Sequence, residues 1–269
     1  MQFGVGRPAR AVRDDGGVAE GDTIRRLARR FEQTLVGETV AASAPNPRGK
    51  AAGIERLDGR RLERVEARGK HFLLDFGELS LHSHLGMNGG WHIYRQGARW
   101  RRPRGSAWAL LSGGGWDAAQ FGGPTLQVMT TARLRRSPEI TRLGPDILAE
   151  DFDEAAVVAA MRANPGRGLG DALLDQHLVA GIGNIFKSEA CFAAGIDPWR
   201  PIGDLSEEEL REVLAAARGL MLEAVKSGRH PHKVYRRRRG ACPRCRGPIS
   251  SRGQGDANRT TYWCPRCQR

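Results

Sequence analysis

The segment LLDQHLVAGIGNIFKSE, residues 173–189, carries the strongest structural information in the chain. Its first residues have the apolar spacing of a helix, and we expect a short helix over Leu173–Leu178. The following Val179–Gly183 is too rich in glycine for a helix interior and predicts a tight turn. A second helix is then expected from Asn184 to Ala194. The segment therefore predicts two helices joined by a glycine-bearing turn, with Asn184 first in the second helix.

The start of the second helix is a candidate site for an anion. Backbone N–H groups in the first turn of a helix have no partner within the helix, and the helix dipole adds positive potential there. Asn184 offers a further side-chain donor at the same place. An ordinary helical hairpin, with glycines for close packing, explains the spacing as well, and from spacing alone both interpretations remain open.

Two Cys-x-x-Cys pairs lie near the end of the chain, with 18 residues between them. This spacing is typical of a zinc ribbon, in which four thiolates surround one tetrahedral zinc ion. Four protein ligands leave no open coordination position, so we expect the zinc to be structural. The fifth cysteine, Cys191, lies in an apolar helical setting and is interpreted as an inert core thiol. The predicted ligands are Cys242, Cys245, Cys264 and Cys267.

Two further segments suggest loops with a function. Between the cysteine pairs, Arg259 precedes the strand-like Thr260–Trp263, which predicts a hairpin that presents an arginine. In Ser83–Trp91, three glycines surround Met87 and predict a mobile loop with an apolar tip. Such a tip on a basic protein can insert into a base stack, although a hairpin turn with Met87 packed in the core explains the loop equally well.

Upstream of residue 150 the sequence favours strands over helices. A helix is expected from Thr23, capped by Asp22 and closed by Gly37. Several short strands then follow at a spacing that indicates a β-sandwich. After Asp151 the pattern becomes helical, with helices expected over Asp153–Ala163 and Leu205–Ser227. The clearest strands are His71–Phe76, Leu79–His84, Trp91–Tyr94, Ala107–Leu111 and Thr125–Thr130.

Composition restricts the class of partner. The 269 residues carry a formal net charge of +13, which favours a polyanionic partner. No apolar run approaches the roughly 18 residues of a membrane helix, so we expect no membrane association. The first 17 residues lack the apolar core of a signal peptide, and we therefore expect a cytoplasmic, nucleoid-associated protein.

Together with Ala19-Glu-Gly-Asp-Thr-Ile24, these segments resemble the formamidopyrimidine-DNA glycosylase and endonuclease VIII family of bifunctional DNA repair enzymes. The resemblance extends over residues 19–269 and is greatest to the endonuclease VIII-like enzymes of actinobacteria. It implies a two-domain α+β fold, with an N-terminal β-sandwich that has a leading helix. The C-terminal domain would be a helix-two-turn-helix domain with the four-cysteine zinc ribbon. It also implies a monomer that binds double-stranded DNA with damaged bases or abasic sites in the cleft between its domains.

The resemblance also predicts where the domains of the chain begin and end. Residues 1–18 are expected to be a disordered extension or a mis-assigned start. The remaining predicted parts are a catalytic β-sandwich domain at 19–135, a linker at 136–152, a helical DNA-binding domain at 153–235 and the zinc ribbon at 236–269.

In the family, the chain-terminal proline amine attacks C1′ of the damaged nucleotide, and Ala19 stands at its position. A free α-amine has a pKa of roughly 7.7–8.0, so part of it is neutral and nucleophilic at pH 7. Our hypothesis is that translation starts at Val18 on a GTG codon and that methionine removal exposes Ala19. The primary amine of alanine would form an imine that is neutral until protonated, which would slow the reaction relative to proline.

Five other residues match functional positions of the family. Glu20 would transfer protons to the opening sugar, although a charge at this place also favours the N-terminus of the first helix. Lys70 would contact the phosphate at the damage site and is the alternative amine; its simpler interpretation is one cation on a basic strand. Asn184 and Arg259 would bind the phosphates that flank the lesion, and Met87 would fill the space left by the extruded nucleotide.

Two departures from the family narrow the substrate. Gln120-Phe-Gly-Gly lacks the arginine pair of the purine-oxidation branch, which favours oxidised pyrimidines or abasic sites. Thr23 stands where many members have a second glutamate. We therefore predict a DNA glycosylase and abasic-site lyase that nicks the strand by β/δ-elimination. The alternative is a non-catalytic or lyase-only member of the family, and an RNA-associated zinc-ribbon protein would leave the Asn184 and Lys70 segments unexplained.

Overall fold

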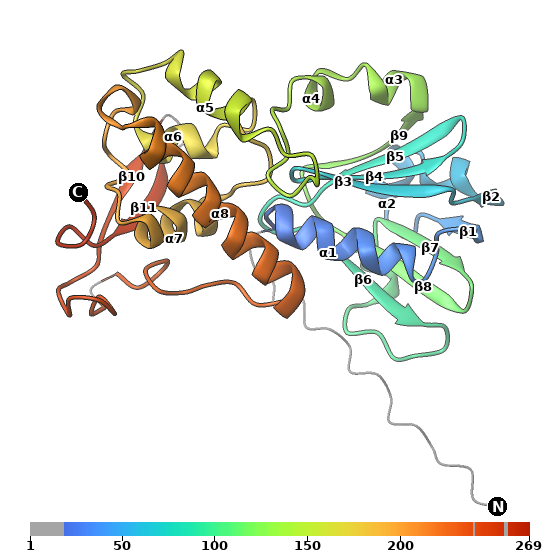
Figure 1. Ribbon diagram of the computed structural model, residues 1–269. Helices are drawn as coiled ribbons and strands as arrows, with labels where there is room; N and C mark the ends of the chain where they lie inside the picture. Colours follow the sequence, from blue (N-terminus) through green and yellow to red (C-terminus); the bar gives the residue numbers. More distant parts are fainter. Residues whose placement is uncertain (1–18, 239, 256–257) are drawn as a thin grey trace, which may run out of the picture.

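The structure is a computed structural model that describes residues 19–238, 240–255 and 258–269. Figure 1 shows a β-rich N-terminal half beside a mostly helical C-terminal half that ends in a small hairpin. The predicted extension or mis-assigned start, residues 1–18, lies outside the described residues. Among the described residues, no helix is both long and apolar enough to cross a membrane.

The N-terminal half is a sandwich of two antiparallel sheets, which confirms the predicted fold class. One sheet has the strand order β2-β1-β7-β8-β6 and the other has the order β3-β4-β5-β9. Apolar side chains on the facing sides of both sheets, such as Leu74 and Leu111, form the buried core between them. The strands are β1 (Thr39–Ser43), β2 (Arg60–Arg61), β3 (Arg64–Arg68), β4 (His71–Phe76), β5 (Leu79–His84), β6 (Gly90–Arg95), β7 (Ala109–Gly113), β8 (Trp116–Phe121) and β9 (Thr125–Thr130).

Helices cover the sandwich. Phe31 of α1 (Gly21–Glu32) is fully buried and packs edge-on against Phe72 and Trp91, with ring centroids 5.0 and 5.2 Å away. The short helices α3 (Thr131–Arg135) and α4 (Pro138–Thr141) lie within or beside the predicted linker and cover an outer face of the second sheet. Two further short elements are α2 (Pro47–Ala51) and the 3-10 helix η1 (Ile54–Leu57), and a second 3-10 turn, η2, spans Arg104–Ser106.

The limits of α1 differ from the prediction. The helix begins at Gly21 with Glu20 as its N-cap, so Asp22 lies inside the first turn and does not cap it. It ends at Glu32. Beyond this residue the backbone N–H groups no longer follow the helical pattern of one carbonyl each: the carbonyl of Phe31 accepts from several of them, including the N–H of Val36 at 3.0 Å. Gly37 closes this turn region at φ +89°, not the helix itself.

The C-terminal half is built around two long helices, α7 (Asn184–Ala194) and α8 (Glu207–Ser227). A capping box of Ser206 and Glu209 starts α8. Cys191 of α7 is buried in the shared core as predicted, and burial raises the pKa of its thiol to about 12. The other helices here are α5 (Glu154–Arg162), α6 (Leu169–Leu174) and the 3-10 turn η3 (Ile202–Asp204).

The first helix of the segment 173–189 was predicted too far along the chain, since α6 spans Leu169–Leu174 and not Leu173–Leu178. The structure ends α6 at Leu174, four residues before the predicted end. Asp175 leaves the helix in an extended conformation, and its carboxylate accepts a 2.9 Å bond from the N–H of His177. Gln176 then organises the turn, because its side chain accepts from the N–H of Gly181 and donates to the carbonyl of Ile182. These polar side chains override the apolar spacing that suggested a helix.

The ribbon hairpin packs against α7. Strands β10 (Ser250–Gln254) and β11 (Arg259–Trp263) pair so that Gln254 faces Arg259 across the turn. The N–H of Tyr262 donates to the hydroxyl of Ser188 on α7. Arg259 is thereby placed at the tip end of the hairpin, near the start of α7.

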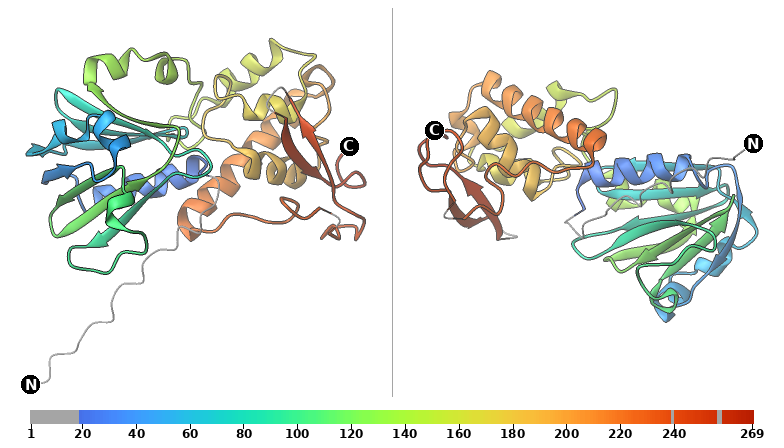
Figure 2. Two further views of the ribbon diagram at one scale, coloured as in Figure 1. Left: turned by 180° about the vertical axis from the view of Figure 1, so that it is seen from behind. Right: turned by 90° about the horizontal axis from the view of Figure 1, so that it is seen from below.

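The two halves meet where the C-terminal end of α8 lies against the start of α1 (Figure 1 and Figure 2). The N–H of Gly21 donates to the carbonyl of Gly181 at 3.0 Å. A Cβ atom on residue 21 would lie 3.0 Å from the Cα atom of Gly181, so this close approach favours glycine. The start of α1 is therefore fixed directly against the turn that precedes α7.

Candidate active site

Glu20 connects the two halves of the molecule. Its side chain is fully buried and makes no cap bond to α1. Its carboxylate instead accepts hydrogen bonds from the backbone N–H groups of Gly183 (3.0 Å), Ile185 (2.8 Å) and Phe186 (3.3 Å). Gly183 makes room for it, because a Cβ atom there would overlap the carboxylate. The charge of Glu20 thus stabilises the N-terminus of α7 from the other half of the chain.

This bonding changes the expected anion site at the start of α7. Glu20 occupies amides that the sequence analysis left open for a phosphate, so those amides are not free to bind one. The side chain of Asn184 lies beside them. Its Nδ2 atom donates to the carbonyl of Thr260 at 2.8 Å, and its Oδ1 atom is buried without a hydrogen-bond partner in the described part of the chain.

Lys70 and Glu20 influence each other electrostatically. Burial lowers the pKa of Lys70 to about 8, and the negative charge of Glu20 opposes that shift. Burial also raises the pKa of Glu20, while the charge of Lys70 opposes the rise. A carboxyl with a raised pKa beside an amine with a lowered pKa is suited to proton transfer near neutral pH.

One cavity of about 530 Å³ is lined by residues from both halves of the chain. This volume falls within the range of small-molecule sites. The backbone N–H of Ala19 lies on its wall and donates to the carbonyl of Gly86 at 3.3 Å. The cavity brings together all six residues for which the sequence analysis predicted a catalytic or DNA-binding role: Ala19, Glu20, Lys70, Met87, Asn184 and Arg259.

Met87 lies in the loop between β5 and β6, and 56% of its surface is exposed. The alternative interpretation, in which Met87 packs into the core, is therefore wrong. Across the cavity, the Nη1 atom of Arg259 lies 3.6 Å from the Sδ atom of Met87. An apolar tip and a guanidinium from opposite halves of the molecule thus meet at the mouth of the cavity.

Several cavity residues were not singled out from the sequence. His84 ends β5, and burial together with the nearby Lys70 lowers the pKa of its imidazole. Arg167 donates to Asp171 at 3.0 Å and to Asp175 at 2.6 Å. The four-residue spacing of these charges predicts ion pairs, but it does not predict which way they face. The remaining lining residues are Gly86, Leu174, Gln176, His177, Gly183 and Gln254.

The four predicted zinc ligands form a closed site. Their Sγ atoms all lie within 4.8 Å of one another, with Cys242 and Cys267 at 3.8 Å and Cys245 and Cys264 at 3.5 Å. A tetrahedral zinc ion with Zn–S bonds of about 2.3 Å requires sulfur atoms about 3.8 Å apart. The donor set therefore fits one structural zinc ion and leaves no position for a substrate.

The fold and this site define the class of protein. Residues 18–114 match the formamidopyrimidine-DNA glycosylase N-terminal domain, and residues 143–235 match the formamidopyrimidine-DNA glycosylase H2TH domain. Residues 241–269 match the zinc finger found in FPG and IleRS. The chain belongs to the formamidopyrimidine-DNA glycosylase and endonuclease 8 family, as its motifs predicted.

Particular relatives cover nearly the whole chain. A probable endonuclease 8 2 of Streptomyces coelicolor is 37% identical, over 93% of this chain and 93% of that protein. The DNA-(apurinic or apyrimidinic site) lyase Nei2 of Mycolicibacterium smegmatis is 32% identical, over 93% of this chain and 98% of that protein. Among solved structures, the MutM (Fpg) protein of Thermus thermophilus has a TM-score of 0.76 at 30% identity, covering 93% and 98% of the two chains.

Proposed function

We propose that this protein is a base-excision repair enzyme, a DNA glycosylase that also cleaves the strand as an abasic-site lyase. The observation that carries this proposal is the single cavity shared by Ala19, Glu20 and Lys70 with Asn184 and Arg259. The names of its relatives, which include endonucleases, glycosylases and an abasic-site lyase, support the same reaction class.

The nucleophile that we assign is the amine of Ala19, in a chain that begins at this residue. The neutral amine attacks C1′, the damaged base leaves, and an imine links the sugar to the enzyme. Protonated, this imine accepts the electron pair left when a proton passes from C2′ to water, and the resulting enamine expels the 3′ phosphate; loss of the C4′ proton then expels the 5′ phosphate in the same way. The carbonyl of Gly86, 3.3 Å from the Ala19 nitrogen, is an acceptor that would orient the amine.

Glu20 is the proton donor of the proposed reaction. Its raised pKa keeps a larger fraction of the carboxyl protonated than an exposed glutamate would have at the same pH. A proton delivered to the sugar ring oxygen opens the ring and permits imine formation. Lys70, with its pKa lowered to about 8, remains mostly a cation at pH 7 and would contact the phosphate at the lesion.

Asn184 and Arg259 are proposed to bind the phosphates on either side of the damaged nucleotide. Asn184 is attached to the hairpin strand that carries Arg259, through its 2.8 Å bond to the carbonyl of Thr260. This bond holds the two residues on adjoining elements at the same end of the hairpin. Met87, exposed on the loop between β5 and β6, would enter the base stack as the nucleotide leaves it.

The preferred substrate that we propose is double-stranded DNA with an oxidised pyrimidine or an abasic site. The absence of an arginine pair in Gln120-Phe-Gly-Gly supports this choice over oxidised purines. We further propose that the enzyme works as a monomer on the chromosome in the cytoplasm. Nicking of duplexes that contain each lesion would test the choice of substrate. Sedimentation of the free protein would test whether it is a monomer.

Borohydride trapping on abasic DNA tests the nucleophile. Two forms are compared: one that begins at Ala19, verified by intact mass, and one that retains residues 1–18. We expect a covalent adduct on the N-terminal peptide of the first form only. An adduct on Lys70 would replace Ala19 as the nucleophile. Failure of both forms to trap or nick DNA would leave binding without catalysis as the function.

A further inference from the structure

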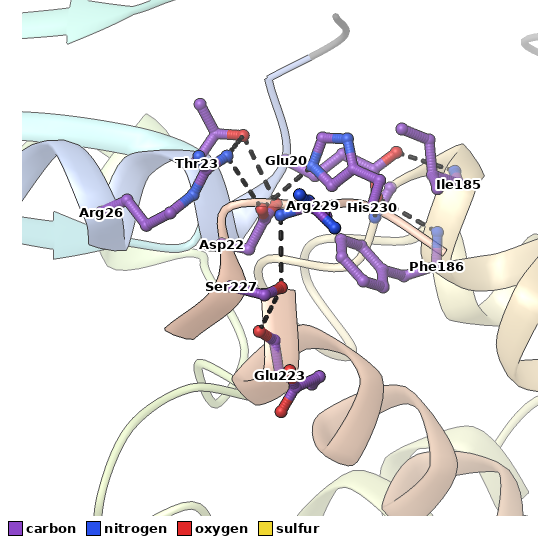
Figure 3. Close-up of polar contacts among 11 residues, drawn as sticks. Glu20, Asp22, Thr23, Arg26, Ile185, Phe186, Glu223, Ser227, Arg229 and His230 are labelled. Atoms are coloured by element: carbon purple, nitrogen blue, oxygen red, sulfur yellow. Dashed lines mark hydrogen bonds and ion pairs between the residues drawn. The ribbon is translucent and has the colours of Figure 1, made fainter. Parts of the chain in front are cut away.

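Asp22 and His230 form a partly buried ion pair between segments 208 residues apart. The Nε2–H of His230 donates to Oδ2 of Asp22 at 2.9 Å, and the Asp22 side chain is fully buried. Figure 3 shows this pair directly beside Glu20. Asp22 belongs to the first turn of α1, whereas His230 lies two residues beyond Gly228, the C-cap of α8. The contact therefore fastens the catalytic end of α1 to the segment that leads into the zinc ribbon.

His230 also contacts the residue that binds Glu20. Its ring packs edge-on against the ring of Phe186, with centroids 5.6 Å apart and an interplanar angle of 88°. The backbone N–H of Phe186 in turn donates to the Glu20 carboxylate. The imidazole of His230 thus contacts both Asp22, two residues after Glu20, and Phe186, whose backbone N–H binds the Glu20 carboxylate.

We propose that His230 is a positioning residue, which through Asp22 and Phe186 holds the Ala19–Glu20 segment in its reactive place against α7. This inference rests on the proposed function for its effect on rate. The glycosylase reaction itself gives His230 no direct role, because it does not line the cavity.

The surroundings of His230 favour its charged form. Asp22 and Glu20 contribute negative charge, and Arg26, which itself bonds to Asp22 at 3.3 Å, contributes positive charge. Burial alone would lower the pKa of His230, but the bond to Asp22 outweighs it and raises the pKa above its ordinary value. The imidazolium is therefore favoured more than in a free histidine, and the pair weakens as the pH rises through the raised pKa of His230.

The first test measures single-turnover cleavage of abasic DNA. His230→Phe keeps a ring against Phe186 but removes the bond to Asp22, and we expect it to lower the rate by about tenfold or more with the DNA affinity unchanged. Asp22→Asn should have a similar effect, and the double variant should be no slower than the slower single variant. His230→Gln, which retains an N–H donor, should recover much of the rate. His232→Phe, the same change at an exposed neighbouring position, is the control and should react normally.

The second test does not depend on activity. Hydrogen exchange of the Ile185 and Phe186 amides reports directly on whether the Glu20 carboxylate is in place. We expect exchange about tenfold faster in His230→Phe than in the wild-type protein or in His232→Phe. Unchanged exchange, or additive losses of rate in the double variant, would overturn the positioning role. A wild-type protein that fails to cleave DNA would refute the proposed function, and the exchange experiment would still decide on His230.

Discussion

The Oε1 atom of Glu20 accepts a 2.8 Å hydrogen bond from the backbone N–H of Ile185, which lies 165 residues further along the chain. The carboxylate that is proposed to transfer the proton is thus also the contact that joins the β-sandwich to the helical half. Movement of one half against the other would displace this group from the sugar. Catalysis in this enzyme should therefore depend on the contacts between its halves as strongly as on the cavity residues.

Replacement of Glu20 by glutamine tests its two roles at once. Glutamine cannot donate a proton as an acid. Its side-chain NH2 group would also point at one or more of the three backbone N–H groups that bind the carboxylate, and two donors cannot form a hydrogen bond with each other. We expect the single-turnover rate on abasic DNA to fall by about 10²-fold or more. Borohydride trapping measures this loss, and a rate within threefold of wild type would contradict the assignment. Asp204→Asn, a change of the same kind on the exposed turn before α8, serves as the control.

The lowered pKa of Lys70 predicts a pH dependence of DNA binding. The side chain is an ammonium below a pH of about 8 and loses its charge above it, so binding to a stable abasic-site analogue should weaken between pH 7 and 9. Such an analogue forms no imine, and the measurement uses the form that retains residues 1–18, in which the nitrogen of Ala19 is an amide that does not titrate. Lys70→Arg should bind equally at both pH values, and Lys70→Gln should bind weakly at both. A pH-independent wild-type affinity would contradict the proposed phosphate contact.

Residues that carry chemistry in short motifs could be predicted from the sequence. The four cysteines stand in a pattern that has few other uses, whereas Glu20 and Asn184 were selected through the resemblance to the family, and the structure brings these two to one cavity. The structure also explains why the turn at 179–183 contains glycine. Gly181 has a φ of +104°, which side chains rarely permit, and Gly183 leaves room for the carboxylate of Glu20.

Contacts between distant segments could not be predicted. Nothing in the sequence connects Asp22 to His230, since Asp22 has the ordinary pattern of a helix cap. The occupation of the α7 amides by Glu20 was missed for the same reason. The register of α6 was missed because the hydrogen bonds of Asp175 and Gln176 to the turn oppose the apolar spacing of Leu173, Leu174 and Leu178.

Met87→Ala should reduce the recognition of damage without loss of stability. The side chain is 56% exposed, so its removal should change the free energy of unfolding by no more than about 0.5 kcal/mol. The preference for abasic over undamaged duplex should fall by about tenfold, because no apolar group fills the space left by the extruded nucleotide. Leu222→Ala, at an exposed apolar residue of α8, is the matched control. Equal effects of the two changes on DNA preference would contradict a wedge at Met87.

Loss of zinc should unfold the β10–β11 hairpin that carries Arg259. Cys264→Ser breaks the four-sulfur site, and we expect no bound zinc and an affinity for DNA lower by about 10²-fold. Far-ultraviolet circular dichroism should change little, because the sandwich and helices have their own cores. Cys191→Ser, at the buried cysteine outside the cluster, should retain one equivalent of zinc. Metal analysis checks both variants, and retention of zinc by Cys264→Ser would refute the ligand assignment.

Lys187→Met tests whether a buried charge beneath the hairpin has a cost in stability. The Lys187 side chain is fully buried, and its Nζ atom donates to the hydroxyl of Thr261 at 2.5 Å. Burial lowers its pKa to about 8, whereas the unfolded chain keeps the ordinary value near 10.4. The folded state therefore carries a free-energy penalty below pH 8 that disappears as the pH rises from about 8 to about 10.4.

Methionine has a similar volume and no charge, so Lys187→Met should be more stable than the wild type at pH 7, by about 1–3 kcal/mol. This advantage should shrink steadily between pH 8 and 10 in urea unfolding. Lys226→Met, at an exposed lysine of α8, should show neither effect. A Lys187→Met protein that is less stable at pH 7 would mean that the bond to Thr261 outweighs the desolvation of the ammonium. DNA affinity, measured by titration of an abasic duplex, should nevertheless fall in Lys187→Met, because Thr261 lies two residues from Arg259 and loses one of the bonds that hold β11 against α7.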